Sequence, residues 1–253
     1  MPTTLPTKAL IEAYNSPEGE PTPTGYTWLD KPLHGGLKRK QLLVVGALDN
    51  VGKSRVCLGM VVRRALLGKH TLYISVEDGE EEVGRRLSKV LHGLPESEQG
   101  LVHLYTHYSF PLPEPHSVAD AIMAAPSDIS LFIVDYIQAL SEEENNALKS
   151  ALRCVFQAAT HANAGLVVAS QLTERYDLSG QLLKPPTRRW LRGSRSMSNM
   201  SHAVVVLWKE QGAVLARLDK NKAGDVDIQV TLPTEYGGAI LGDGKDGEID
   251  AEW

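Results

Sequence analysis

Two hydrophobic patterns alternate along the first two thirds of the chain. Short apolar runs predict buried strands at residues 42–47, 71–77, 131–134 and 165–170. Longer stretches at 54–68 and roughly 142–163 predict helices that follow strands. Strands of this kind that alternate with helices are typical of a parallel sheet covered on both faces. We therefore expect an α/β domain built on a mostly parallel, twisted sheet.

The pattern changes after residue 192. Three alternating runs at 202–208, 213–220 and 226–232 are separated by turns that contain glycine, which predicts antiparallel or edge strands. The run SPEGEPTPTG at residues 16–25, rich in proline and glutamate, is expected to form no core element, and 1–24 is assigned to an N-terminal arm and linker. Residues 25–240 are expected to form one domain, and 241–253 an acidic tail.

Composition limits the function classes. The chain has 253 residues, 42% of them hydrophobic and 23% charged, which is ordinary for a globular domain. The net charge of −5 gives no global basic footprint, so a nucleic-acid contact would need a local cluster of basic residues. Two cysteines without metal-ligand spacing, no secretion signal and no long apolar stretch favour a cytoplasmic protein without a membrane span.

Residues 47–54 (ALDNVGKS) lie between a predicted strand and a predicted helix, as a phosphate-binding P-loop requires. Gly52 allows the backbone to approach phosphates, Lys53 adds a positive charge, and Ser54 offers a hydroxyl to Mg²⁺. Ala47 departs from the strict pattern, which has glycine there, and a chance Gly-Lys-Ser is the alternative. The residues predicted to bind nucleotide are Ala47, Asn50, Val51, Gly52, Lys53, Ser54 and Arg55.

Two acidic residues at predicted strand ends complete this chemistry. Asp135 follows LFIV, and with a P-loop upstream it is predicted to hold Mg²⁺. Glu77 ends TLYISVE and is predicted to orient the attacking water. For Asp135 alone the alternative is a turn residue. The acids that follow Glu77 are interpreted as a solvated helix N-terminus.

Five segments in this order resemble the C-terminal motor domain of DnaB-family replicative helicases and the helicase domain of phage primase-helicases. They are TGYTWLDKPLHGGLKRKQLLVVGA before the P-loop, ISVED, VDYIQ, ASQL and LRGS, and the similarity covers roughly residues 24–232. The family's P-loop often begins with alanine. The resemblance implies a RecA-like P-loop NTPase core that uses ATP or another NTP with Mg²⁺. It also implies a homo-hexameric ring that moves 5′ to 3′ on single-stranded DNA and separates duplex strands.

The resemblance also assigns individual residues. It implies that Lys53 and Ser54 bind phosphate and magnesium, that Glu77 activates water, and that Asp135 supports the metal. It implies that Gln171 senses the γ-phosphate, although an ordinary loop glutamine is the alternative. Lys220 and Lys222 stand where the family has a basic pair that reaches into the neighbouring subunit's site. Lysine cannot form the bidentate contacts of arginine, and a solvated hairpin is an equal interpretation of these two residues.

The stretch from Arg175 to Arg195 is basic and contains Tyr176 and Trp190, which favours contact with single-stranded DNA. A basic surface loop with Trp190 anchored in the core is the alternative. The predicted DNA-binding residues are Arg188, Arg189, Arg192, Gly193, Ser194 and Arg195.

The sequence is also compatible with further partners and with two other functions. The tail EIDAEW could dock on a polymerase, a primase or a single-strand-binding protein, or be a plain disordered tail. Before the matching segments the sequence resembles neither the helical collar nor the primase domain that usually precedes such a motor, so the resemblance does not extend to loading or primase coupling. The alternative functions are an accessory ATPase or recombination mediator that binds DNA without unwinding it, and a non-catalytic regulatory paralogue.

Overall fold

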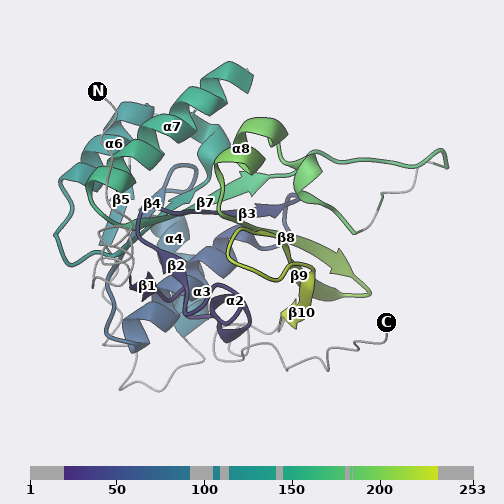
Figure 1. The fold of residues 1–253 in the computed structure, drawn as a ribbon, viewed down its shortest axis with the longest axis horizontal. Helices are drawn as coiled ribbons and strands as arrows, with labels where there is room; N and C mark the ends of the chain where they lie inside the picture. The colour runs from purple at the N-terminus through teal and green to yellow at the C-terminus, as the bar shows by residue number, and fades with distance from the viewer. Residues whose placement is uncertain are drawn as a thin grey trace, which may run out of the picture.

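The computed structural model describes residues 20–91, 105–108, 114–140, 145–179, 183 and 185–232, with the backbone alone at 105–108. Its centre is an eight-stranded sheet with the order β10-β9-β8-β3-β7-β6-β4-β5 (Figure 1). The strands are β3 (Leu42–Ala47), β4 (Thr71–Ser75), β5 (Tyr105–Tyr108), β6 (Leu131–Asp135), β7 (Gly165–Gln171), β8 (Ala203–Glu210), β9 (Ala213–Asn221) and β10 (Ile228–Leu232). The predicted α/β architecture is confirmed.

The strand directions differ from the prediction at one place. The alternating run at residues 202–208 was expected to be antiparallel or to lie at an edge, but β8 pairs in parallel with β3 inside the sheet. The long connection after β7 returns the chain to the other side of β3, so β8 enters in the same direction as the other strands. On its other side β8 pairs antiparallel with β9, and β9 pairs antiparallel with β10. A short turn at Gln211 and Gly212 joins β8 to β9.

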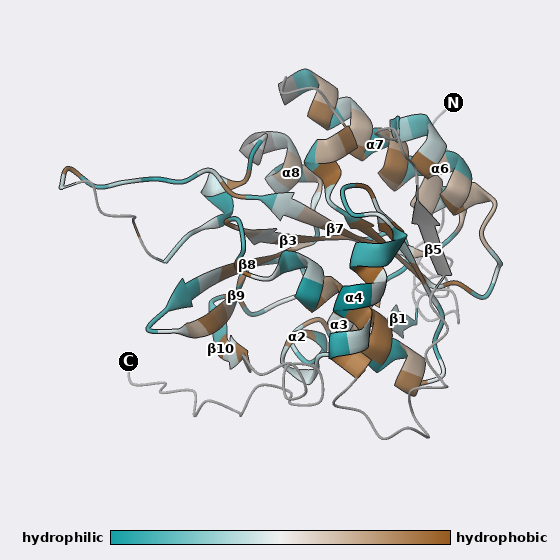
Figure 2. Cartoon of the chain, turned by 180° about the vertical axis from the view of Figure 1, so that it is seen from behind, coloured by the Kyte–Doolittle hydropathy of each residue, from teal (hydrophilic) through white to brown (hydrophobic). Residues whose placement is uncertain are grey.

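Helices cover both faces of the sheet (Figures 1 and 2). On one face lie α3 (Lys53–Leu66) and α4 (Glu80–Leu91), and on the other lie α6 (Pro115–Met123), α7 (Asn145–His161) and α8 (Ser194–Met200). Side chains alternate along β3, so that Leu43 and Val45 pack in the cluster that contains α3, whereas Leu42 and Val44 pack in the cluster that contains α7. The strand that leads into the P-loop is therefore buried from both sides, which fixes the position of its end.

The end of the predicted linker is part of the folded domain. Strand β1 (Pro21–Thr22) pairs antiparallel with β2 (Leu37–Lys38), and Thr22 and Thr24 are buried. The fully buried Arg64 guanidinium donates to the Pro23 carbonyl, to the His70 carbonyl and to hydroxyls of the Thr22, Thr71 and Ser130 side chains. Burial lowers the pKa of Arg64 to about 10. The expectation that residues 16–25 form no core element is wrong for residues 21–24, because a buried arginine needs these carbonyl and hydroxyl acceptors.

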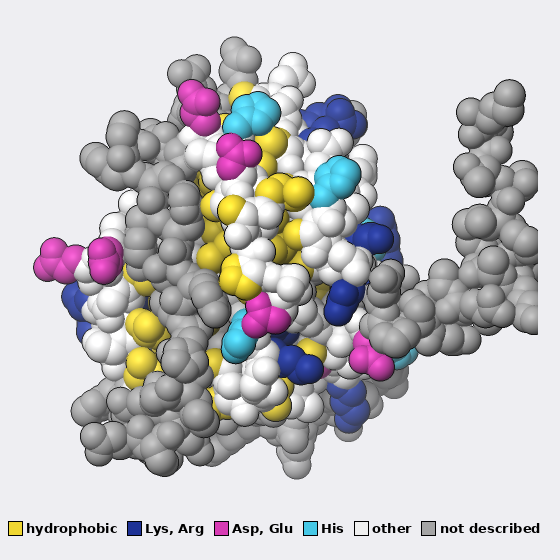
Figure 3. Space-filling model, turned by 90° about the vertical axis from the view of Figure 1, so that its left-hand side faces the viewer, with side chains coloured by type: hydrophobic (Ala, Val, Ile, Leu, Met, Phe, Trp, Pro, Cys, Tyr) yellow, Lys and Arg dark blue, Asp and Glu magenta, His cyan; other side chains and the backbone are white. Residues whose placement is uncertain are grey.

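The short helix α2 (Thr27–Asp30) follows this segment, and the Asp30 carboxylate accepts from the backbone N–H groups of Thr24 and Gly25. Residues 1–19 of the predicted N-terminal arm and linker, and the predicted acidic tail at 241–253, lie outside the described residues. Seen from the β5 side, the described charged side chains of both signs are interspersed (Figure 3). None of the described helices is both long and apolar enough to span a membrane.

Candidate functional site

The P-loop joins β3 to α3 and has the backbone shape that phosphate binding needs. Gly52 has φ 121° and Asn50 has φ 56°, both in the region that favours glycine or asparagine. Gly52 is the N-cap of α3 and no side chain caps this helix, so its first N–H groups point outward without a side-chain acceptor. A helix N-terminus in this state is suited to binding an anion.

A cleft of about 740 Å³ opens above the P-loop at the carboxyl ends of the central parallel strands. It is lined by residues 49–55 together with Glu77, Asp135 and Gln171, which come from three other connections of the sheet. The turn between β8 and β9 closes one side with Lys209 and Gly212. Pockets of roughly 300–1,000 Å³ hold ligands of nucleotide size. The structure thus brings the predicted P-loop, both acids and the glutamine to one cleft, whereas Ala47 is buried at its base.

Asp135 is the last residue of β6, and its side chain is nearly inaccessible, with 4% of the residue exposed. The buried Tyr73 hydroxyl on β4 donates a 2.7 Å hydrogen bond to Oδ2 of Asp135. This bond is possible because β4 and β6 are neighbours in register, with Ser75 opposite Asp135. Tyr73 therefore fixes the orientation of the carboxylate that is predicted to hold the metal.

The donor set fits Mg²⁺ that is held together with a nucleotide. Among the described residues no group of three or more His, Cys, Asp or Glu side chains could cage a metal ion by itself. Asp135 and the Ser54 hydroxyl, with phosphate oxygens, form the kind of oxygen set that magnesium uses with nucleotides. When bound, the ion would supply positive charge against the phosphates.

Glu77 lies two residues beyond β4, with its side chain exposed at the cleft. Partial burial raises the pKa of Glu77, and the negative charges of Asp78 and Asp135 raise it further. The neighbouring Asp78 is engaged elsewhere, because its carboxylate forms a 2.7 Å ion pair with Arg86. Of these two adjacent acids, Glu77 is the one that is available to accept a proton from water.

Gln171 ends β7 and faces the P-loop across the cleft. Its amide Nε2 donates to both carboxylate oxygens of Asp49, at 2.8 and 2.7 Å. Oδ1 of Asp49 also lies 3.8 Å from the Lys53 ammonium. The Gln138 side chain holds the strand end in place, because it accepts from the backbone N–H of Gln171 and donates to the Ser170 hydroxyl.

Lys220 and Lys222, the predicted pair for a neighbouring subunit, do not line this cleft. The Lys220 ammonium donates to the carbonyls of Ser198 and Ser201 at the end of α8. Burial, followed by the charges of Lys222 and Arg188, lowers the pKa of Lys220 to about 8. Lys222 is exposed in the turn after β9, so it is the member of the pair that can reach another molecule.

The predicted DNA-binding arginines differ in their surroundings. Arg188 pairs with the buried Asp219 carboxylate at 3.4 Å, and Trp190 is buried in the core, as the alternative interpretation held. Arg189 and Arg192 are exposed. Gly193 has φ 67° and is the N-cap of α8, while the side chains of Ser194 and Arg195 lie outside the described part.

A protruding segment precedes these arginines, which we call the arm and define as residues 174–179, 183, 185 and 186 (Figure 1). Its two sides are joined by a 2.8 Å bond from the Leu183 N–H to the Arg175 carbonyl. Tyr176 and Leu178 are exposed on it, at 56% and 110% of their reference areas. At its base the backbone N–H of Thr173 donates to the Trp190 carbonyl, and the backbone N–H of Arg192 donates to the Gln171 carbonyl. We call residues 171–173 and 190–192 the neck.

Sequence reasoning missed Tyr73 and Asp49. Tyr73 occurs in an apolar strand, where a tyrosine usually indicates core packing, and only its hydroxyl shows that the strand faces a polar group. Asp49 could have been noticed in the sequence. An acid inside a loop that binds phosphates is unfavourable unless another group binds its carboxylate, so its presence predicts such a partner.

A P-loop, an acid at the end of a neighbouring strand, a glutamate after β4 and a polar strand end at β7 define a P-loop NTPase with a RecA-like fold. A profile of the AAA domain family matches residues 21–173, more than half of the chain. The chain belongs to the AAA domain family.

Two curated relatives, both the DNA repair protein RadA from strains of Mycobacterium tuberculosis, are 26% identical to this chain over 243 residues. The match covers 95% of this chain and 46% of each relative, so the chain spans about half the length of these proteins. The relationship is distant but extends over almost the whole chain.

Two solved structures share the fold. A DnaB-like replicative helicase, described with its interactions with primase, matches with a TM-score of 0.74 and 17% identity over 93% of this chain and 66% of its own. The ATPase domain of a second protein matches with a TM-score of 0.73 and 17% identity over 91% of this chain and 96% of its own. The resemblance to DnaB-like helicases that the motifs indicated is thus confirmed at the level of the fold.

Proposed function

We propose that this chain is an ATP-hydrolysing motor that moves on single-stranded DNA and separates duplex strands as a ring of identical subunits. The observation that carries the proposal is the shared strand end at β7. Gln171 lies in the cleft with Lys53, Glu77 and Asp135, and the next residues form the neck of the exposed arm. Loss of the γ-phosphate would therefore change the contacts of a residue that adjoins the arm, and the arm is exposed enough to bind a polymer.

The proposed hydrolysis follows from the positions of these groups. The α3 N-terminus and Lys53 bind the phosphates, and Ser54 and Asp135 hold Mg²⁺. Glu77 accepts the proton of the attacking water, for which its raised pKa makes it a stronger base. The exposed arginines Arg189 and Arg192 and the arm's Tyr176 supply phosphate contacts and a stacking surface for DNA.

A second candidate is an accessory ATPase that binds single-stranded DNA during repair without separating strands. The sequence match to the DNA repair protein RadA over 95% of this chain favours it. Both candidates predict hydrolysis that DNA stimulates, and they differ only in strand displacement.

The test measures ATP hydrolysis with and without single-stranded DNA, and strand displacement from a tailed duplex. We expect DNA stimulation and displacement in the wild type, and loss of both in Lys53→Ala. Lys69→Ala is the matched control, because Lys69 is exposed after the end of α3 and does not line the cleft. Stimulated hydrolysis without displacement would select the accessory ATPase, and no hydrolysis at all would reject both candidates in favour of a regulatory paralogue.

A mixing experiment tests the ring. If Lys222 acts on the neighbouring subunit's nucleotide, Lys222→Ala and Lys53→Ala are each inactive alone, but mixed rings contain some interfaces with both lysines intact. We expect the mixture to regain part of the wild-type rate. A Lys222→Ala protein at full rate, or a mixture that stays inactive, would remove Lys222 from the proposed site.

A further inference from the structure

The P-loop contains an acid that occupies the two groups a γ-phosphate would need. Asp49 accepts from the Gln171 amide through both carboxylate oxygens, at 2.8 and 2.7 Å, and lies 3.8 Å from the Lys53 ammonium. A terminal phosphate offers the same chemistry, an anionic group with several acceptor oxygens. From this geometry we propose that Asp49 sets the site's discrimination between nucleoside triphosphate and diphosphate, by competing with the γ-phosphate for Gln171.

Asp49 can give way because, within the described part of the chain, its side chain contacts Gln171 and Lys53 through the carboxylate and is otherwise open to water. Its side chain is 68% exposed, so water can take over its solvation when it turns out of the cleft. Gln171, by contrast, is fixed at its backbone by the Gln138 side chain and by Arg192 in the neck. When the two side chains separate, the exposed acid therefore moves away, and the strand end that carries the glutamine amide stays in place.

The competition is selective for the third phosphate. This inference rests on the proposed function, in which Lys53 contacts the β- and γ-phosphates and Gln171 only the γ-phosphate. A diphosphate replaces only the contact between Asp49 and Lys53. At 3.8 Å this contact is long for an ion pair. A triphosphate must also break the contact between Asp49 and Gln171. The negative charge of the displaced Asp49 carboxylate then still lies near the γ-phosphate and repels it. Asp49 should therefore lower affinity for the triphosphate more than affinity for the diphosphate.

The experiment measures the dissociation constants of ADP and of the non-hydrolysable triphosphate AMP-PNP with Mg²⁺, by calorimetry on the full chain. In Asp49→Ala we expect AMP-PNP to bind about three- to tenfold tighter, and ADP to change by less than about twofold, as the loss of the charge-assisted contacts with Gln171 and of a weak pair with Lys53 suggests. Asp120→Ala, which removes an exposed acid on α6 that does not line the cleft, should change neither constant.

A second variant separates competition for Gln171 from simple repulsion between Asp49 and the phosphates. In a Gln171→Ala background, Asp49→Ala should lose most of its selective effect on AMP-PNP. Equal tightening of ADP and AMP-PNP, weaker AMP-PNP binding, or a selective effect that persists without Gln171 would each overturn the role of Asp49. If the wild type binds neither nucleotide and Lys53→Ala behaves identically, the proposed function fails and this inference fails with it.

Discussion

The cleft and the arm share the neck at the end of β7 but are built in opposite ways. In the cleft, buried or paired groups position the side chains, as Tyr73 does for Asp135 and Gln138 does for Gln171. In the described part of the arm, Tyr176 and Leu178 are exposed, and the Tyr176 hydroxyl donates to the Glu174 carboxylate. Chemistry requires positions that are fixed before the substrate arrives, whereas a segment that follows a flexible polymer needs exposed groups.

This contrast predicts that substitutions in the cleft change rates through geometry, whereas substitutions in the arm leave the fold intact. The neck has an intermediate place, since Trp190 and Leu191 are buried in the core while Arg192 is exposed. Its main-chain bonds to residues 171 and 173 connect the two regions.

The largest effect is expected at Glu77. Glu77→Gln removes the proposed base but keeps the shape of the side chain, so ATP hydrolysis should fall by roughly 10²–10⁴-fold while nucleotide affinity stays close to wild type. Asp78→Asn is the matched control and should cost less than about tenfold, because Asp78 pairs with Arg86. A Glu77→Gln protein that keeps a tenth of the wild-type rate would place the water-activating group elsewhere.

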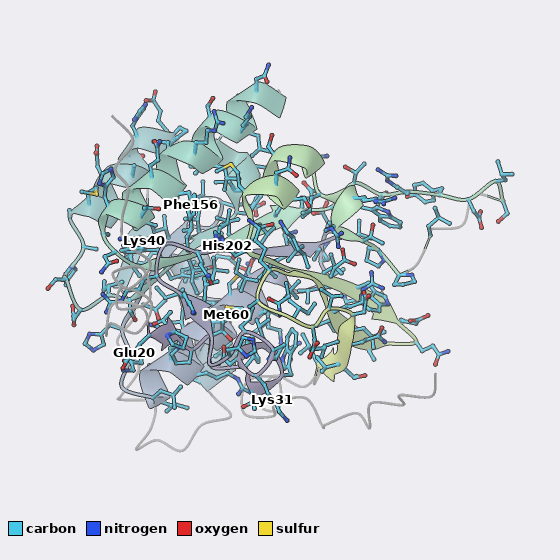
Figure 4. All side chains as sticks on the ribbon, in the orientation of Figure 1. Glu20, Lys31, Lys40, Met60, Phe156 and His202 are labelled. Atoms are coloured by element: carbon cyan, nitrogen blue, oxygen red, sulfur yellow. The ribbon has the colours of Figure 1, made fainter. Side chains whose placement is uncertain are left out.

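Acid is expected to lower the free energy of unfolding by about 2 kcal/mol through His202, which bonds to the first residue of β3. The Nδ1 of His202 accepts from the N–H of Leu42, the first residue of the P-loop strand, and the ring lies beside Phe156, 6.4 Å between centroids (Figure 4). Burial, then the charges of Lys222 and Lys220, lowers the pKa of His202 from 6.5 to about 4. The unfolded chain therefore binds a proton first, so this stability is present above pH 6.5 and is lost as the pH falls toward 4.

The His202 contribution is checked by melting temperatures between pH 7.5 and 4. The ring is only half-buried, so solvent screens its charge. The loss of unfolding free energy should therefore be about 2 kcal/mol, which is less than the pKa shift of a fully buried ring would imply. His202→Asn keeps an acceptor for Leu42 but cannot be protonated, so its melting temperature should fall less with acid. Parallel curves for the two proteins would show that another group titrates.

Tyr73→Phe should cost about 1 kcal/mol, because it removes the hydroxyl that orients Asp135 without creating a cavity. We expect hydrolysis to require about five- to tenfold more Mg²⁺ for half-maximal rate. Tyr26→Phe is the matched control, since its buried hydroxyl donates at 3.4 Å to the Val56 carbonyl and touches no acid. The same shift of the magnesium requirement in both variants would rule out a specific role for Tyr73.

The sequence predicts what lies in consecutive residues and misses what depends on strand order. Gly52, Lys53 and Ser54 are adjacent, and Asp135 directly follows its strand, so their patterns were readable. The bond from Tyr73 to Asp135 needs β4 beside β6, and the bond from Gln171 to Asp49 needs β7 beside β3. The spacing of residues along the chain does not predict which strands are neighbours in the sheet. Arg64 was missed for the same reason, since its partners come from segments that are separate in sequence.

The smallest effect on the fold is expected in the arm. Replacing the exposed Tyr176 or Leu178 with serine should change the free energy of unfolding by less than about 0.5 kcal/mol, because neither residue is packed in the core. Tyr176→Ser should nevertheless weaken binding of single-stranded DNA by about tenfold, within the roughly 1–3 kcal/mol of a stacked base. Leu178→Ser should weaken it less, since an aliphatic side chain offers no ring.

The opposite result is expected at the nearby neck. Trp190→Ala removes a buried ring there and should cost roughly 3–5 kcal/mol of unfolding free energy, measured by denaturant titration alongside the arm variants. If Tyr176→Ser unfolded as easily as Trp190→Ala, the arm would be part of the packed domain. If it bound DNA as tightly as the wild type, the exposed arginines at residues 189 and 192 would have to carry the contact without the arm, and the link from the nucleotide to DNA would pass through the neck alone.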